Sequence, residues 1–233
     1  MSPAISARRP PGRARPREKV TAIHPSVIRV GAVSVGAGTE IGPFTVLGGR
    51  YRRVNGKVLR ARSTTRIGRG CQIGSHVQIL RGSEIGDRSS IDGGCTVEQD
   101  VVIGETCVLT YHATVCNEAT LGRDSIIGGF IGERSKVGEG SRVFGQLIHR
   151  QDDPARAWDD TEEESPVLGD HVFVGFGAVI IGGVRIGRRS FVCAGALVTE
   201  DVPDRHIVRG DGEMAHHSKL KWRLAKSRWF SDD

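Results

Sequence analysis

The sequence predicts a solenoid of stacked six-residue rungs. An α-helix repeats its apolar face every 3.6 residues and a half-buried strand every 2 residues, so a strict period of six belongs to neither. One rung cannot bury its aliphatic side chain alone, whereas stacked rungs bury a continuous column, and three such faces give a turn of eighteen residues. That period runs without a break through Ile67, Ile73, Ile79, Ile85, Ile91, Val97, Ile103, Leu109, Val115, Leu121 and Ile127.

Two further features of each rung fit the same coil. The residue four places after the aliphatic is usually small, as at Ser83 and Ala113. Gly often follows the aliphatic directly, as in Ile85-Gly86, where we expect the chain to turn a corner at little steric cost. The small inward position also holds three of the five cysteines, which we therefore expect to be buried thiols of a reducing compartment: Cys71, Cys95 and Cys107.

Length and composition restrict the classes of protein to which the chain can belong. A chain of 233 residues is long enough for one domain with an adequate core, and a formal charge of +6 makes acidic partners worth considering. Residues 1–20 are rich in Pro and Arg, so we expect a disordered basic tail; with no interleaved aromatic residue, they do not favour a nucleic-acid partner. No apolar run reaches the roughly 18 residues of a membrane span and the N-terminus lacks an apolar signal region, so we expect a cytoplasmic protein without a membrane partner.

The six-residue period begins at Ile23 and predicts a coil domain over residues 21–205, with two loop insertions. The first, residues 48–66, contains Asn55-Gly56, which is typical of the turn of a β-hairpin. Its basic side chains either contact a phosphorylated substrate or cap a neighbouring subunit. The second, residues 144–167, carries an acidic run over 152–164, which either orients a cationic amine or is simply solvated.

Residues 206–233 lie beyond the last rung. Leu220, Leu224 and Trp229 alternate with basic residues that include Lys219 and Lys221. This spacing predicts a short amphipathic C-terminal helix, which packs across a subunit or neutralises the phosphates of a coenzyme.

The residues also resemble a known family. The repeat of aliphatic, Gly, two variable residues and a small residue is similar to that of the hexapeptide-repeat acyltransferases, which are all-β proteins folded as left-handed parallel β-helices. In the C-terminal half, a His-bearing loop followed by the segments 166–170, 172–180 and 198–203 resembles the galactoside, maltose and xenobiotic acetyltransferases. The resemblance implies a homotrimer with active sites between neighbouring coils, and acetyl-CoA or succinyl-CoA as co-substrate with no tightly bound cofactor.

By the same resemblance, a His at the start of the loop is the catalytic base, and here that residue is His149. A base is needed because an amine or hydroxyl acceptor loses a proton as it attacks the thioester, and imidazole can accept that proton near neutral pH. His112, on an outward corner of the coil, is the second candidate for the base.

Small corner residues would let a pantetheine arm lie against the coil, although corner geometry alone also explains them. The candidates for contact with the donor are these small residues and the two lysines of the extension: Gly175, Gly177, Gly182, Gly183, Ala194, Gly195, Lys219 and Lys221. The related acetyltransferases close with a Gly-Asn-Pro-Ala segment, where this chain has 208–213 instead, so the contacts at this end are open.

Three classes of function remain after these observations. The first is acyl transfer from acyl-CoA to an amino or hydroxyl group of a small metabolite, such as an amino sugar or an amino acid. The second is a γ-type carbonic anhydrase, which binds zinc through three His, two of them five residues apart on one coil. That pair is missing, since His76, His112 and His171 are widely spread, and no metal site is predicted. The third is a non-catalytic coil for binding or assembly, which leaves the His149 loop without a role.

Overall fold

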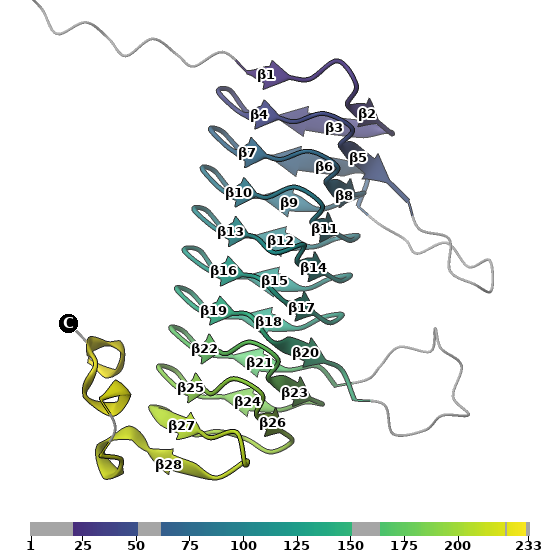
Figure 1. Cartoon of the computed structure of the whole chain (residues 1–233). Helices are drawn as coiled ribbons and strands as arrows, with labels where there is room; N and C mark the ends of the chain where they lie inside the picture. Colours follow the sequence, from purple (N-terminus) through teal and green to yellow (C-terminus); the bar gives the residue numbers. More distant parts are fainter. Residues whose placement is uncertain (1–20, 51–61, 151–163, 222, 232–233) are drawn as a thin grey trace, which may run out of the picture.

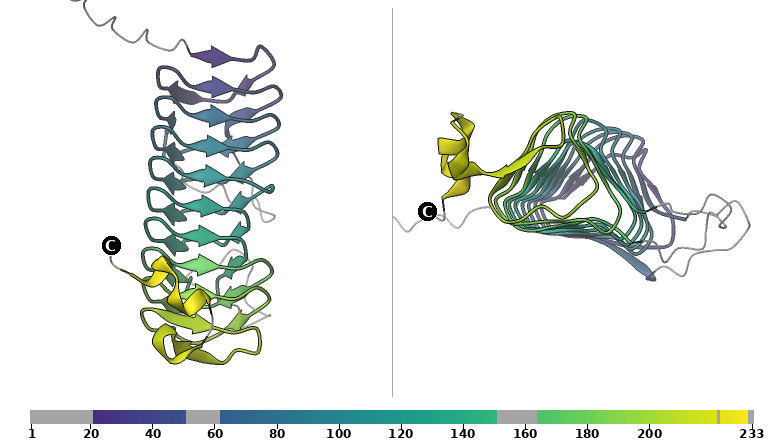
Figure 2. Two further views of the ribbon diagram at one scale, coloured as in Figure 1. Left: turned by 60° about the vertical axis from the view of Figure 1, so that its left-hand side comes forward. Right: turned by 90° about the horizontal axis from the view of Figure 1, so that it is seen from below.

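A computed structural model of the chain describes residues 21–50, 62–150, 164–221 and 223–231. Over these ranges the chain winds into a three-sided prism, with one sheet of parallel strands on each side (Figure 1). Seen along its axis, the coil is a triangle (Figure 2). Aliphatic side chains fill the interior. The predicted solenoid is confirmed.

Each sheet takes every third strand of the coil. The first sheet contains β1 (Ala22–Ile23), β4 (Glu40–Ile41), β7 (Gln72–Ile73), β10 (Ser90–Ile91), β13 (Val108–Leu109), β16 (Ile126–Ile127), β19 (Arg142–Val143), β22 (Phe173–Val174), β25 (Phe191–Val192), β27 (His206–Val208) and β28 (Met214–His216). The second sheet contains β2 (Ile28–Arg29), β5 (Val46–Gly49), β8 (Gln78–Leu80), β11 (Thr96–Val97), β14 (Thr114–Val115), β17 (Phe130–Ile131), β20 (Gln146–Ile148), β23 (Val179–Ile181) and β26 (Leu197–Val198). The third sheet contains β3 (Ala32–Val35), β6 (Thr64–Ile67), β9 (Glu84–Ile85), β12 (Val102–Ile103), β15 (Thr120–Leu121), β18 (Lys136–Val137), β21 (Val167–Leu168) and β24 (Arg185–Ile186).

The register of the strands follows the aliphatic column. Ile73 pairs with Ile91, and Ile91 with Leu109, so each of these turns takes eighteen residues as the sequence predicts. Within a strand the first residue faces outward and the second faces the interior, where the aliphatic side chains are almost fully buried. The thiols of Cys71, Cys95 and Cys107 are buried between these layers, as expected.

Glycine has a different role at the corners from the one the sequence suggested. The residue with positive φ is the third after the aliphatic, and it is often not Gly, as at His112 (φ 57°) and Asp124 (φ 58°). The Gly directly after the aliphatic is required for close approach between turns. A Cβ added to Gly86 would lie 2.4 Å from the carbonyl carbon of Gly104, so stacking of the corners excludes any side chain there.

Two consecutive corners are shortened. Val115 pairs with Ile131, and Ile131 with Leu147, so these two turns take sixteen residues each. Gly129 and Gly145 make these corners possible, because a Cβ on Gly129 would lie 1.9 Å from the carbonyl oxygen of Gly145. The second short corner returns Leu147 to the interior, so β20 continues the coil to Ile148, whereas the expected insertion began at residue 144.

Both interruptions of the repeat connect the second sheet to the third. The first lies between β5 and β6, and the second between β20 and β21. The predicted hairpin around Asn55-Gly56, the acidic run except for Glu164, and the basic tail over 1–20 lie outside the described residues. No helix in the part of the chain that is described is long and apolar enough to cross a membrane.

The C-terminal extension differs from the predicted amphipathic helix. After β27, strand β28 turns back antiparallel, and three short 3-10 turns follow: η1 (His217–Lys219), η2 (Leu224–Lys226) and η3 (Arg228–Phe230). The turns cover the outer face of the first sheet, where Trp229 meets Phe173 edge-on with ring centroids 6.1 Å apart. The apolar residues were expected to lie along one helix face, but packing against a flat sheet favours short turns that each present one or two of them.

The aliphatic column is the first property to test. Replacing Leu109, which is fully buried, by Ala should lower the free energy of unfolding by about 2–5 kcal/mol, because it removes apolar contacts and leaves a cavity. Replacing Val108, its outward-facing neighbour in β13, by Ala should cost clearly less. Urea unfolding at a fixed protein concentration measures both variants, and equal losses would contradict the described register.

The extension should loosen in acid. The Nδ1 atom of His216 accepts a hydrogen bond from the backbone N–H of Ser218 at 3.3 Å, which a protonated ring cannot do. Desolvation, followed by His217 and His206, lowers the pKa of His216. The folded state therefore binds fewer protons than the unfolded state, so this contribution to stability is complete above pH about 6.5 and declines below it.

Hydrogen exchange of residues 206–230, corrected for the intrinsic rate, should therefore be faster at pH 5.5 than at pH 7.5. In His216→Asn, whose side-chain oxygen can cap the same N–H without titrating, the pH effect should shrink. An identical pH effect in wild type and variant would show that His216 is not responsible.

Candidate active site

The predicted site residues lie on two different edges of the prism. We call the corners between the first and second sheets the first edge, and those between the second and third sheets the second edge. The first edge carries His112, Gly175, Gly177, Ala194 and Gly195. The second edge carries His149, Gly182 and Gly183. Within one chain, the two candidate bases are therefore not brought together.

Strand register stacks a set of polar residues on the second edge. The inward residues Val97, Val115, Ile131, Leu147 and Ile180 pair in succession. The residue two places after each of them begins the corner, so these five positions also follow one another along the edge. They are Gln99, Asn117, Glu133, His149 and Gly182, which we call the polar column.

Hydrogen bonds connect the three members of the polar column that precede His149. The Asn117 Oδ1 atom accepts from the backbone N–H of Gln99 at 3.1 Å, and the Asn117 Nδ2 atom donates to Glu133 Oε1 at 3.1 Å. The backbone N–H of Asn117 donates to Oε2 of Glu98, also at 3.1 Å. Asn117 is almost fully buried, so it is a rigid link between turns rather than a surface residue.

His149 is the next member, and its position is fixed by its neighbours. It directly follows Ile148 of β20, whose carbonyl accepts from the N–H of Gly182 at 2.9 Å. A Cβ added to Gly132 would lie 3.5 Å from the backbone nitrogen of His149, so the two turns are in close contact here. The imidazole is half-buried, with part of it open to solvent.

The C-terminal end of the second insertion lies against the corner that carries His149. The backbone N–H of Arg150 donates to the carbonyl of Glu164 at 2.9 Å, so the two ends of the insertion are joined. The hydroxyl of Ser165 donates to the carbonyl of Glu133 at 2.6 Å. On the next turn of the coil, the Glu164 side chain lies against Gly183. A Cβ added to Gly183 would be 2.8 Å from the Cβ of Glu164. Gly183 thus leaves space on the C-terminal side of the candidate site that a larger residue would fill.

A buried thiol completes the surroundings. Cys116 precedes Asn117, and its pKa is raised strongly by burial and further by the carboxylates of Glu98 and Glu133. The thiolate is the nucleophilic form of cysteine, so this thiol is unsuited to forming a covalent intermediate. Imidazole is a side chain that can accept a proton at neutral pH, and His149 brings one to this edge.

The first edge has a different character. His112 is exposed, and its ring lies against Gly94 of the previous turn, where a Cβ would be 2.3 Å from Nδ1. Beside it, Tyr111 and Phe176 are 65% and 56% exposed, and both rings contact Phe144. Around His112, this edge therefore presents an exposed aromatic surface.

The remaining candidates lie apart from both bases. Lys219 and Lys221 are exposed in the C-terminal extension, on either side of Leu220, which packs toward the outer face of the first sheet. His76 lies on the first edge, whereas His171 lies on the edge between the third and first sheets. Among the described residues, no group of three His, Cys, Asp or Glu side chains is arranged to hold a metal ion.

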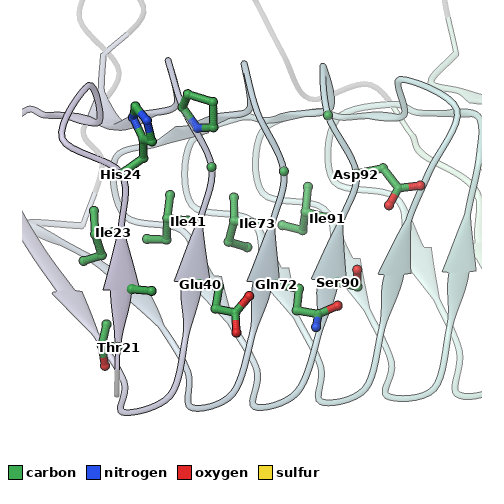
Figure 3. Close-up of a pocket in the computed structure, with 15 residues that line it drawn as sticks. Thr21, Ile23, His24, Glu40, Ile41, Gln72, Ile73, Ser90, Ile91 and Asp92 are labelled. Carbon is green, nitrogen blue, oxygen red and sulfur yellow. The ribbon is translucent and has the colours of Figure 1, made fainter. Parts of the chain in front are cut away.

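A groove of about 940 Å³ follows the outer face of the first sheet over its first four strands. Figure 3 shows His24 and Asp92 near one margin of this groove, with Glu40, Gln72 and Ser90 along its strands. The Nδ1 atom of His24 accepts from the backbone N–H of Ser26 at 3.2 Å, so this imidazole supports the opening corner. The groove lies at the opposite end of the coil from His149.

The sequence pointed to His149 as a candidate base but did not indicate Glu133 and Asn117, which the structure places in the same column. Glu133 is two residues after Ile131, and His149 is two residues after Leu147, so their alignment depends on the sixteen-residue turn. An eighteen-residue count places neither in the same column. The signal was present in the four-residue spacing from Ile127 to Ile131, and again from Val143 to Leu147.

The rungs, the three parallel sheets and the two interruptions define the class as a parallel β-helix of hexapeptide repeats. The family model "Bacterial transferase hexapeptide (six repeats)" matches residues 64–99 and 165–200. The coil is therefore a left-handed β-helix built of hexapeptide repeats.

Curated relatives are similar over part of their length. The bifunctional protein GlmU of Koribacter versatilis is 27% identical over 194 residues, which cover 77% of this chain and 38% of that protein. GlmU of Exiguobacterium sibiricum is 30% identical over 183 residues, covering 73% of this chain and 40% of that protein. The chain thus spans about two fifths of the length of these relatives.

Solved structures share the fold. The UDP-N-acetylglucosamine acyltransferase of Campylobacter jejuni superposes with a TM-score of 0.56 at 15% identity, covering 83% of this chain and 73% of that one. The enzyme of the same name from Francisella novicida gives a TM-score of 0.53 at 20% identity, covering 83% and 68%.

Proposed function

We propose that this protein is an acyltransferase that moves an acetyl or succinyl group from acyl-CoA to an amino or hydroxyl group of a small metabolite. The observation that carries the proposal is the placement of His149. Its half-buried imidazole stands at the end of β20, above Glu133, where both ends of the second insertion meet the coil. The names of the relatives, which include acyltransferases acting on a sugar nucleotide, support the same reaction class.

The proposed mechanism is direct transfer. His149 accepts a proton from the acceptor amine or hydroxyl as that group attacks the thioester carbonyl. The tetrahedral intermediate then collapses, the carbon–sulfur bond breaks, and the proton passes to the departing thiolate of CoA. Covalent catalysis through Cys116 is disfavoured, because burial and two carboxylates keep that thiol protonated.

The small residues of the second edge fit a role beside this base. Gly182 and Gly183 follow β23, one turn closer to the C-terminus than His149. A Cβ at Gly183 would meet the Glu164 side chain. The chain of the donor would pass here. Gly175, Gly177, Ala194 and Gly195 lie on the first edge, so they contact the same donor only across an interface between copies of the protein.

That interface is part of the proposal, with a trimer as the assembly. The aromatic cluster of Tyr111, Phe144 and Phe176 is the exposed apolar surface that a second copy would cover. Exposed apolar surface of this kind is typical of protein–protein contacts. Lys219 and Lys221 would then face the solvent near the coenzyme phosphates or the neighbouring copy.

The assay for the function is release of free thiol from acetyl-CoA and succinyl-CoA with a panel of small amines and amino sugars. His149→Ala should lower kcat by about 10²-fold or more while CoA binding is retained, because it removes the general base. His76→Ala is the matched control, since that His occupies a coil corner on the first edge, against Phe44, and should keep full activity.

If His149→Ala releases thiol at the wild-type rate while His112→Ala does not, the base has been assigned to the wrong edge. If the wild-type protein neither binds CoA nor releases thiol, the proposed reaction is wrong, and a non-catalytic coil is the better description.

The trimer is tested separately. Phe176→Glu places a charge in the aromatic cluster and should shift the protein toward its 25.1 kDa monomer in sedimentation velocity. Glu105→Lys, an exposed change on the edge between the third and first sheets, should leave the assembly intact. Wild-type protein that sediments as a monomer, or a Phe176→Glu variant that remains a trimer, would contradict the interface.

A further inference from the structure

Two stacked side chains on the second edge hold buried polar atoms that no described residue pairs with. Arg81 lies one layer before Gln99 on this edge. Their strands pair through Ile79 and Val97, and each polar residue follows its strand residue by two positions. Gln99 is only 1% exposed, and both of its amide atoms are unpaired, as is the buried Nε atom of Arg81. Buried polar groups are nearly always hydrogen-bonded, so these three atoms need an explanation.

The two side chains do not satisfy each other. The Nε atom of Arg81 is a donor and the Oε1 atom of Gln99 is an acceptor, yet no hydrogen bond joins them. The backbone of Arg81 is fixed, because its N–H donates to the carbonyl of Gly49 at 2.9 Å and its carbonyl accepts from the N–H of Asp100 at 3.1 Å. The backbone N–H of Gln99 donates to Oδ1 of Asn117 at 3.1 Å. A group bound between these two fixed residues would satisfy both side chains.

The charge of Arg81 has no counterpart among the described residues. Its Nη2 atom donates to the carbonyl of Ser63 at 3.4 Å, which is a neutral partner. The neighbouring Arg62 lies between two carboxylates, with Nη1 2.8 Å from Glu84 and Nε 3.5 Å from Asp100. Arg62 therefore already has anionic partners, whereas the guanidinium of Arg81 remains free to bind an anion.

A phosphate group matches all three unpaired atoms. The Nε–H of Arg81 and the amide N–H of Gln99 can each donate to a phosphate oxygen, and a protonated phosphate oxygen can donate to Oε1 of Gln99. A carboxylate offers acceptors but no donor, so it would leave Oε1 unpaired. Hydrogen bonds from a guanidinium to phosphate are charge-assisted and roughly twice as strong as neutral ones.

We propose that Arg81 and Gln99 form a phosphate-binding site on the second edge, apart from the candidate base. Three layers of the coil lie between Gln99 and His149, which is roughly 14 Å at about 4.8 Å per layer. Arg81 is half-buried, so part of it is open to solvent and meets the phosphate first. The amide of Gln99 then turns to the phosphate without losing a hydrogen bond. The site does not depend on the catalytic role of His149.

The test is equilibrium dialysis of the full-length protein with ³²P-labelled inorganic phosphate at fixed ionic strength. Arg81→Gln removes the charge and should weaken phosphate binding about 10-fold or more, because hydrogen bonds to a charged group are lost. Arg88→Gln is the matched control, since Arg88 is exposed on the edge between the third and first sheets and pairs with Glu105. The control should bind phosphate as the wild-type protein does.

Gln99→Leu separates a ligand site from a structural role. Leu has a similar volume and no polar atom, so it should weaken phosphate binding about 5-fold or more. The melting temperature without phosphate should stay equal or rise, because an unpaired amide has been removed. A lower melting temperature with unchanged phosphate binding would show a structural amide and overturn the site.

The remaining outcomes come from the same dialysis. Equal affinities in Arg81→Gln and Arg88→Gln, or wild-type protein that binds no phosphate, would overturn the proposal, and the unpaired atoms would then meet water only. Acetate that displaces phosphate at equal concentration would overturn the assignment to phosphate.

Two further comparisons separate the site from the function and identify the source of the phosphate. His149→Ala should bind phosphate as tightly as the wild-type protein, so absence of thiol release would refute the acyltransferase and leave this site standing. An acceptor identified by thiol release that displaces phosphate competitively carries the phosphate itself. Phosphate that stays bound beside the acceptor is a free ion.

Discussion

Each six-residue rung places one large aliphatic side chain in the interior, so no rung is stable without the rungs on either side of it. This mutual burial is the constraint on which the remaining structure depends. It fixes every second residue of a strand inward and brings the corners so close that Gly86 and Gly104 leave no room for a side chain between them. What is free to vary is the outer face of each sheet and the tip of each corner. A functional site must therefore be built from these outward-facing positions.

The second edge carries the candidate site. Both interruptions of the repeat lie there, and between them Asn117 is buried and Glu98 and Glu133 flank a buried thiol. Buried polar groups must be hydrogen-bonded to be tolerated, and the Asn117 amide meets this requirement across adjacent turns. Repetition of the coil converts a single corner position into a column in which one residue orients the next.

The sequence predicted what depends on periodicity. The aliphatic column, the buried cysteines and the eighteen-residue turn follow from a spacing that the stacked layers must obey. The reason for the corner glycines was different from the one expected. Gly86 is required because the neighbouring turn leaves no room for a Cβ, and this contact cannot be read from the local sequence pattern. The predicted C-terminal helix was wrong for a related reason. Leu220, Leu224 and Trp229 pack in one cluster with Phe191, so the surface of the sheet decides the shape of this segment.

The candidate site was predicted only in part. His149 stands out because it begins an interruption of the repeat. Nothing in the sequence around Glu133 marks it, and it is aligned with the polar column only because the corners at Gly129 and Gly145 are short. The division of the small residues between two edges was also hidden, since Gly177 and Gly182 are neighbours in sequence but follow strands of different sheets. Such relations require the register of every turn between them.

The central claim is that acyl transfer takes place at the second edge, and a crystal structure with a stable ketone analogue of acetyl-CoA tests it most directly. The account predicts that the ketone carbonyl, which stands in for the thioester, lies within about 6 Å of the imidazole of His149, leaving room for one acceptor atom between them. A carbonyl bound beside His112 on the first edge, remote from His149 of every copy, would contradict the account.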